Sequence, residues 1–304
     1  MEENKIVYIP DNGRKKASQK KNKRITNTII YIVLALITII WLTPFVLIVL
    51  ESFREYPVSQ VGNPFFPVLE GQEYQWGFGN YINLFTETNF GRWYLNTFII
   101  AVFVAIFQTI IVLCMSYTLS RSRFQGRKLL MNVMLVIGMF PGFLTLLVLY
   151  NFLKDLGFTQ ANAVPGLILV SVASSGMGYH VSKGFFDTVP KALDEAARID
   201  GANRAQVLIK IILPMAKPIV IYTILTAFMG PWADFVFARY ISFGATDGFN
   251  VAVGLWSMLD KAHIGTEYTM FCAGGVLVAL PVTILFMFLQ RYYVEGVTGG
   301  AVKG

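Results

Sequence analysis

Five uncharged apolar stretches of the chain are each long enough to cross a lipid bilayer. They cover residues 29–50, 96–120, 129–153, 159–182 and 268–290. Because about 20 helical residues cross a hydrocarbon layer of about 30 Å, each stretch predicts a membrane-spanning helix. The composition agrees, since 55% of the residues are hydrophobic and 14% are charged, against about 45–50% and 25% in soluble domains. The sequence therefore predicts an all-α membrane protein.

A sixth spanning helix is predicted over residues 218–238. The first 16 of these residues are uncharged, and continuing the helix past Asp234 to Ala238 gives 21 residues with one carboxylate near the outer end. The apolar run 248–259 has 12 residues, too few to cross, so it predicts an interfacial or packed loop segment. We therefore expect six spans in one membrane domain, residues 26–304.

Lys and Arg divide unequally between the two sides of such a six-span chain. One side receives 20 of the 25 and the other receives 5. Since basic residues are enriched in cytoplasmic loops, the richer side is cytoplasmic and both termini lie in the cytoplasm. Residues 1–25 hold 8 of these cations and predict a basic cytoplasmic tail, disordered before Ile25. We interpret the tail as an orientation anchor, with a nucleic-acid arm and a lipid-binding patch as the weaker alternatives. Membrane lipid is an expected partner of the chain, and no nucleic-acid partner is expected.

A polar segment, residues 188–214, separates the fourth and fifth spans and has the pattern of two short helices. Pro190 suits the first turn of a helix, where its missing N–H costs nothing. Gly201 suits the left-handed position just past a helix end. The segment therefore predicts a helix, a glycine turn, a second helix and then Pro214.

The first of these helices offers two surface features. Asp194 and Arg198 are spaced i,i+4, which suits an ion pair on a solvated face. Ala196 and Ala197 leave a patch with little side-chain bulk, where another protein can approach the backbone. From spacing alone, a solvated amphipathic connector is the alternative.

A longer string of fixed positions runs through both helices. Its members are Glu195, Ala196 and Ala197, then Gly201 after three residues, and Ile211, Ile212, Leu213 and Pro214 after nine more. This string resembles the EAA motif of ABC importer permeases. Its place in the loop before the penultimate span makes a chance match a poor explanation.

Further regions resemble carbohydrate permeases of the same family. A group before and at the start of the second span looks like the entry to the transmembrane core: Asn80, Tyr81, Leu84, Phe85, Phe90, Trp93, Asn96 and Thr97. Residues 230–235 and 290–304 look like the MalG type, the second permease of maltodextrin and related oligosaccharide importers.

The resemblance implies the type I ABC importer permease fold in the bacterial cytoplasmic (plasma) membrane. It also implies three kinds of partner, namely a second homologous permease, two ATPase subunits and an extracytoplasmic sugar-binding protein. ATP and Mg would then bind to the partner subunits, and this chain would hold no cofactor of its own.

The resemblance also implies roles for individual residues. The EAA segment would be the coupling helix that docks into a cleft of the ATPase, through Glu195, Ala196, Ala197, Gly201, Leu213 and Pro214. The carboxyl-terminal tail, with Val302, Lys303 and Gly304, would reach the ATPase dimer interface, although from the sequence no stable helix is expected after Val294.

The loop 240–267 is expected on the external face. In the resembling permeases the matching loop enters the cleft of the binding protein, which gives Thr246, Asp247 and Gly248 that role here. We expect Gly244, Asp247 and Gly248 to form an exposed narrow turn. The apolar run from Phe249 onward needs cover, either from its own spans and the external loop 51–95 or from partner proteins.

Two residues are candidates for a translocation path. Asp234 is the one acidic group inside a predicted span, and such a carboxylate is a functional hypothesis. Trp232 could stack on a sugar ring beside it. The alternative is that Asp234 reaches external water next to the break at Pro231.

Catalytic and metal-binding patterns are missing from the sequence. It has no Gly-x-x-x-x-Gly-Lys-Ser/Thr phosphate cradle, no His-Glu-x-x-His and no Gly-x-Ser-x-Gly string. The two histidines, His180 and His263, are far apart, so no metal site and no catalytic residue is expected. Cys114 and Cys272 lie in apolar runs, which predicts buried thiols rather than a disulfide framework.

These expectations favour a non-enzymatic permease for maltose or maltodextrin. A galacto-oligosaccharide or another plant-polysaccharide fragment is the alternative cargo. An ion-coupled secondary transporter is the weaker alternative, since it would need carboxylates near the centre of a span.

Overall fold

The computed structural model describes residues 12–55, 76–139, 145–174, 178–260 and 264–299. Every regular element in these ranges is helical, apart from a single antiparallel bridge between Arg54 and Trp76. The chain divides into two compact units, Met1–Leu50 and Glu51–Gly304.

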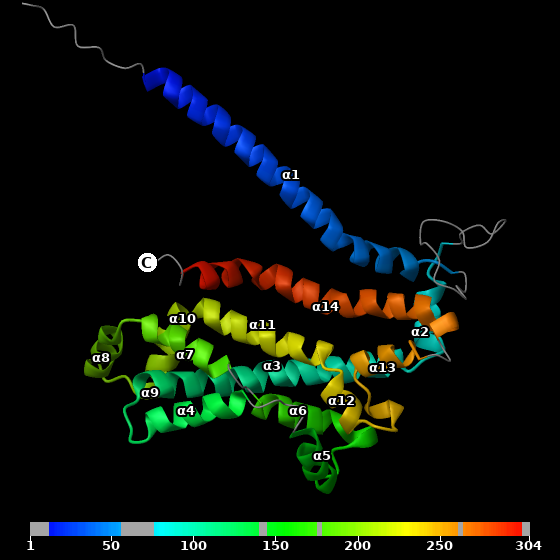
Figure 1. Ribbon diagram of the computed structural model, residues 1–304. Coiled ribbons are helices and arrows are strands. Elements are labelled where there is room, and N and C mark those ends of the chain that lie inside the picture. Colours follow the sequence, from blue (N-terminus) through cyan, green and yellow to red (C-terminus); the bar gives the residue numbers. More distant parts are fainter. Residues whose placement is uncertain (1–11, 56–75, 140–144, 175–177, 261–263, 300–304) are drawn as a thin grey trace, which may run out of the picture. The chain divides into compact units, whose positions relative to one another are not determined.

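The first unit is built from helix α1 (Figure 1), which runs Asn12–Ser52, so that only its last two residues are assigned to the second unit. The prediction of disorder before Ile25 is wrong for the described part of the tail, because the helix begins at Asn12. Two causes are apparent. Lys, Arg, Gln and Ala dominate this stretch and are good helix formers, and an existing helix extends at the cost of ordering one residue per hydrogen bond.

Helix α3, Phe90–Arg121, forms the centre of the second unit. It packs against α11 (Lys217–Ala233), α7 (Gly178–Thr188) and α6 (Ala163–Ala173) (Figure 1). One core cluster, which includes Trp93, Phe228 and Val251, surrounds its first half, and a second cluster surrounds its last turns. The long helix α14, Ile264–Gly299, packs along α11 and α2 (Gly79–Thr86).

The remaining helices are short. They are α4 (Arg127–Gly138), α5 (Leu146–Asp155), η2 (Gln160–Asn162), α8 (Lys191–Ile199), α9 (Arg204–Val207), η3 (Leu208–Ile212), α10 (Leu213–Met215), α12 (Val236–Ile241), η4 (Thr246–Gly248) and α13 (Val251–Ser257). Within the second unit, Figure 1 shows α8, α9 and α10 at one end of α3 and α2, α12 and α13 at the other. These six short helices therefore lie toward the two ends of α3.

Four helical stretches among the described residues are long and apolar enough to cross a membrane: Ile25–Ser52, Phe90–Arg121, Gln160–Thr188 and Glu267–Gln290. A fifth arises if Arg204–Met215 and Lys217–Ala233, which meet at 89°, count as one broken span. The predicted third span corresponds to α4 and α5, on either side of residues 140–144, which lie outside the described ranges. Four to five apolar spans are therefore shown, and the count of six stays a prediction.

The fifth predicted span is shorter than expected. Helix α11 ends at Ala233, not at Ala238, because Asp234 takes an extended backbone conformation with φ −75° and ψ 100°. The side-chain amide of Asn250 donates to the carbonyl oxygens of Asp234 (2.6 Å) and Pro231 (3.4 Å). The helix end is thus satisfied by a residue from another element.

Helix α14 is longer than the sequence predicted. It continues to Gly299, although no helix was expected after Val294. No proline interrupts this stretch, so the existing helix continues at little cost.

Candidate functional site

The EAA segment begins with α8. Pro190 directly precedes this helix rather than lying in its first turn, with φ −57° and ψ 128°. Gly201 has φ +84°, which confirms the predicted left-handed turn. The turn is closed by bonds from the N–H of Gly201 to the carbonyl of Arg198 (3.0 Å) and from the N–H of Ala202 to that of Ala197 (2.9 Å). These bonds satisfy carbonyls that the helix end would leave open.

The second half of the segment is one bent helical run. Asn203 and Gln206 form a reciprocal capping box at its start, with bonds of 2.8 and 2.9 Å. The run then widens into a π-turn over Leu208–Ile212, directly before Leu213 and Pro214. Pro214 has no N–H to donate four residues back, so a local widening relieves the clash of its ring with that turn.

A buried apolar cluster holds the segment against α3 and α7; we call it the coupling cluster. Its members are Leu113, Tyr117, Phe186, Val189, Ala197, Val207, Ile212, Ala216 and Ile219. Ala197 faces into this cluster, whereas Ala196 and Glu195 are exposed. The predicted small-residue patch is therefore divided, with Ala197 used for internal packing and Ala196 left on the surface.

A buried ion pair fixes α8 to the end of α3. The Oδ2 atom of Asp194 lies 2.9 Å from Nε of Arg121, and both side chains are almost fully buried, at 7% and 2% exposure. Nη2 of Arg121 also donates to the carbonyl of Val189 at 2.8 Å. The predicted surface pair between Asp194 and Arg198 is therefore wrong. The Asp194 carboxylate points into the protein, where it pairs with Arg121 of α3 instead of with Arg198.

The outward face of α8 carries a feature that sequence reasoning missed. Ile199 is 87% exposed, and Leu193 is 37% exposed, next to Glu195 and Ala196. The signal was available in the sequence, since Leu193 and Ile199 are the two large apolar residues of α8 and Ile199 does not share the face of Ala197. The exposed face therefore includes one carboxylate, one small residue and two large apolar side chains, of which Ile199 is the more exposed.

At the opposite end of α3, the loop containing η4 is tied to the start of that helix. Nε1 of Trp93 donates to the carbonyl of Thr246 (3.0 Å), and Nδ2 of Asn96 donates to that of Asp247 (2.9 Å). Arg92 forms an exposed ion pair with Asp247 at 3.1 Å. Thr246 and Asp247 are exposed as expected. These bonds hold the backbone of Thr246 and Asp247 to α3, so the position of the loop relative to α3 is fixed.

Gly248 does not lie in the exposed turn that the sequence suggested. It is buried, and a Cβ atom added there would lie 1.8 Å from the carbonyl oxygen of Gln160. The turn glycine of the loop is instead Gly244, with φ +80°. Gly248 is needed for close contact between η4 and η2.

Gly248→Ala is therefore expected to destabilise the second unit by about 1–3 kcal/mol, the usual cost of forcing extra volume into packed structure. The measurement is thermal unfolding of the purified protein in detergent. Gly184→Ala is the matched control, because its added methyl group meets no atom within 4 Å. An unchanged melting temperature for Gly248→Ala would contradict the packing.

The apolar run after this loop is covered mainly by the chain itself. Phe249, Val251, Val253 and Met258 are buried in the large core cluster. Trp256 remains 55% exposed beside Phe235. Packing on the chain's own helices is therefore the correct alternative for most of the run.

The two path candidates have different surroundings. Trp232 is 5% exposed, and its ring lies 5.2 Å from that of Tyr94 and 6.0 Å from that of Phe228. Its faces are covered by the chain's own aromatics, which leaves no open face for a sugar. Asp234 lies beyond the end of α11 and keeps part of its surface, and burial raises the pKa of its carboxyl above the ordinary value.

Other site predictions have simpler outcomes. Val302, Lys303 and Gly304 lie outside the described residues. In the part of the chain that the structure describes, no group of three or more His, Cys, Asp or Glu side chains could hold a metal ion. Neither cysteine is in a disulfide; Cys272 is buried, but Cys114 is exposed, contrary to expectation.

Similarity to known proteins was found at three levels. Residues 113–299 match the model of the family described as "Binding-protein-dependent transport system inner membrane component". The chain is 35% identical to the maltodextrin transport system permease protein MalD of Streptococcus pneumoniae, over 94% of this chain and 99% of that protein. It is 33% identical to the galactooligosaccharides transport system permease protein GanQ of Bacillus subtilis, over 75% of this chain and 80% of that protein.

The fold also has solved neighbours. A chain from the crystal structure of a bacterial ABC transporter involved in the import of the acidic polysaccharide alginate aligns with a TM-score of 0.69 and 23% identity, over 90% of this chain and 98% of that one. A chain from the alginate transporter in complex with its pentasaccharide-bound periplasmic protein aligns with a TM-score of 0.65 and 18% identity, over 88% and 95%. The sequence match and this architecture agree: the chain belongs to the family of inner membrane components of binding-protein-dependent transport systems, the permease subunits of ABC importers, and is an integral membrane protein.

Proposed function

We propose that this permease moves an oligosaccharide, with maltodextrin as the leading candidate, into the cytoplasm as part of an ATP-driven importer. The observation that carries the proposal is the 35% identity to maltodextrin permeases of two organisms, over 94% and 90% of this chain. The match to a galactooligosaccharide permease over 75% of the chain makes that sugar the second candidate.

The proposed importer includes ATPase subunits, which bind ATP. One of the two ATPase subunits, with its ATP and Mg, would dock on the exposed face of α8, where Glu195, Ala196 and Ile199 are accessible. Gly201 would set the angle between the two helical halves of the segment, and Leu213 and Pro214 lie at the end of the second half, next to the start of α11. Motion of α8 would pass to α3 through the Arg121–Asp194 pair and the coupling cluster, since a rigid contact is needed to transmit it.

The proposed orientation has six spans and both termini in the cytoplasm. Helices α8 and α9 and the α3–α4 turn, which carry basic residues, lie at one end of the second unit (Figure 1). That end would face the cytoplasm by the positive-inside rule. A second permease would cover part of the exposed apolar surface, and the η4 loop at the other end would face an extracytoplasmic sugar-binding protein. Asp234, near that end, is the remaining candidate for the sugar path.

The function is tested by uptake in proteoliposomes that contain this permease, its partner permease and the two ATPase subunits. With the sugar-binding protein outside and ATP inside, labelled maltodextrin is expected to accumulate more than labelled galacto-oligosaccharide. An ionophore that collapses ion gradients should leave uptake unchanged. Preferential galacto-oligosaccharide uptake would reassign the cargo, and uptake that needs an ion gradient but no ATP would overturn the mechanism.

The proposed position of the η4 loop predicts a state-dependent crosslink. A cysteine at Thr246, whose side chain is exposed, should crosslink to the binding protein when ATP is bound and hydrolysis is blocked, and only weakly in the resting state. The indole Nε1 of Trp93 donates to the backbone carbonyl of Thr246, and this bond does not depend on the side chain at position 246, so the loop should keep its place.

Cysteine at Lys191 is the matched control, because that exposed residue lies on α8 at the other end of the unit. It should not react with the binding protein in either state. Equal crosslinking of Thr246→Cys in both states would argue against a docking role for the loop.

A further inference from the structure

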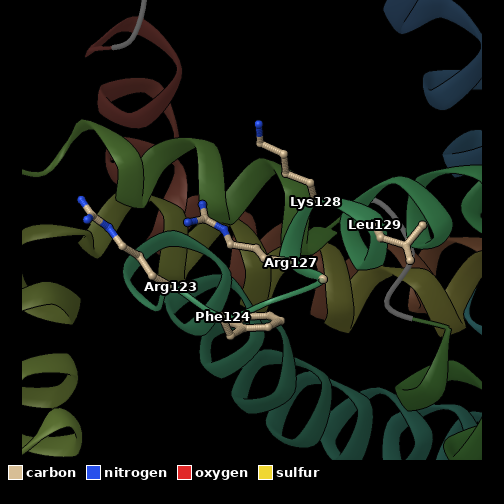
Figure 2. A pocket seen from close by; sticks show the side chains of 6 residues that line it. Arg123, Phe124, Arg127, Lys128 and Leu129 are labelled. Atoms are coloured by element: carbon tan, nitrogen blue, oxygen red, sulfur yellow. The ribbon is translucent and has the colours of Figure 1, made fainter.

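A basic hollow of about 380 Å³ lies at the turn between α3 and α4. Its size falls within the range of about 300–1,000 Å³ that is usual for ligand sites. The lining residues are Arg123, Phe124, Gly126, Arg127, Lys128 and Leu129. In Figure 2, the side chains of Arg123, Arg127 and Lys128 extend to one side of the turn, and the ring of Phe124 lies on the other.

The first turn of α4 adds to the positive charge of this hollow. Gly126, with φ +81°, precedes the helix, and no described side chain caps it. No acidic residue lies in the first turn, where helices usually place one. Instead Arg127 and Lys128 stand at the positive end of the helix dipole. Cations placed there repel the dipole, and a bound anion would relieve that repulsion.

The cations of the hollow are not neutralised by the protein. Among the described residues, neither Arg123 nor Lys128 takes part in an ion pair. Arg127 donates to the neutral carbonyl of Ser122 at 3.4 Å and forms no ion pair among the described residues. Asp187 acts on Arg127 electrostatically, but its carboxylate is already bound by Lys183 and by the hydroxyl of Ser120.

An apolar surface continues from the hollow along α4. No residue of this helix is buried. Exposed apolar side chains follow at helical spacing, namely Leu129 (68%), Val133 (44%), Val136 (64%) and Ile137 (66%). Phe124 is also 43% exposed beside the cations. A positively charged head site that leads directly into an apolar stripe matches a molecule with an anionic head and hydrocarbon tails.

We propose that this hollow binds the phosphate of an anionic glycerophospholipid, whose acyl chains lie along the apolar stripe of α4. Basic pockets at the cytoplasmic ends of spanning helices are suited to such headgroups. Arg123 and Arg127 hold the phosphate oxygens, and Lys128 adds charge at the helix end. The lipid would hold the α3–α4 turn at the membrane surface, next to the end of α3 that carries the coupling helix.

The test uses the assembled transporter in nanodiscs that contain phosphatidylglycerol and phosphatidylcholine. Electron spin resonance of spin-labelled lipids gives the preference of the protein for the anionic lipid. Replacing Arg123, Arg127 and Lys128 by glutamine should lower the preference about fivefold for each charge removed, which corresponds to about 1 kcal/mol per cation. Arg123→Lys with Arg127→Lys should keep the preference within about twofold, since the charge remains.

The matched control replaces Lys20, Lys21 and Lys23 of the amino-terminal tail by glutamine, which removes the same charge elsewhere. This control should lower the preference less than the hollow variant, because the tail is expected to attract anionic lipid through its surface charge alone. Equal losses of preference in both triple variants, or no loss in either, would overturn the proposal that the hollow binds lipid.

Displacement of the labelled lipid by inorganic phosphate alone would assign the hollow to a free anion instead. Preference that is present in the isolated chain but absent in the assembled transporter would mean that the second permease covers this face. Sugar uptake is not part of the measurement, so its failure is separate from that of the proposed function.

Discussion

Replacing Asp194 by alanine is expected to lower the free energy of unfolding by about 3–5 kcal/mol, the usual cost of leaving one member of a buried ion pair without its partner. The guanidinium of Arg121 would remain buried at 2% side-chain exposure, with only the carbonyl of Val189 as a described hydrogen-bond acceptor. Chemical denaturation of the purified protein in detergent, followed by helical circular dichroism, measures the loss. A large loss would identify this pair as the main polar contact between α8 and α3.

The double variant Arg121→Met with Asp194→Ala separates pairing from simple packing. It removes both charges, so it should be more stable than Asp194→Ala alone, because no unpaired charge is left in the interior. Lys191→Ala is the control on the same helix. Its side chain is exposed, and its loss should change stability by no more than about 0.5 kcal/mol. If Asp194→Ala and Lys191→Ala were equally stable, the buried pair would have no structural importance.

Patterns that are local in the sequence predicted the helices well. Long apolar runs identified α3 and α14, and the glycine after the EAA string was correctly placed in a left-handed turn, with φ +84°. These predictions succeeded because span length and the freedom of glycine to take positive φ depend on the nearby chain alone. The errors at the start of α1 and the end of α14 arose where an established helix simply continues.

Contacts between distant segments were not predictable in the same way. Asp194 has a suitable neighbour at Arg198 in sequence, but packing of α8 on α3 brings Arg121 to it instead. Gly248 looked like a turn residue, and only the approach of Gln160 explains why it must lack a side chain. The end of α11 is likewise determined by Asn250, from a later element. One sequence offers several partners for each such group, and tertiary packing selects among them.

The second large effect is expected for substitutions of Glu195 and Ile199, which are both exposed on α8. Glu195→Lys is expected to leave the permease inserted and folded, since the side chain is exposed and surface changes usually cost no more than about 0.5 kcal/mol. Uptake should nevertheless fall at least about tenfold, a loss of about 1.4 kcal/mol in coupling, because the docking carboxylate becomes a cation. Ile199→Ser should weaken binding of the ATPase by about 2 kcal/mol or more if this side chain is a central contact.

Co-purification with the ATPase subunits and sugar uptake in proteoliposomes are measured together for each variant. Glu87→Lys is the charge-matched control, because Glu87 is also exposed but ends α2, at the opposite end of the second unit. It should retain both ATPase binding and uptake. If Glu195→Lys transported sugar normally, the exposed face of α8 would not be the docking surface. If it lost uptake while Ile199→Ser kept full ATPase affinity, docking would depend on the carboxylate and the backbone at Ala196 rather than on apolar contact.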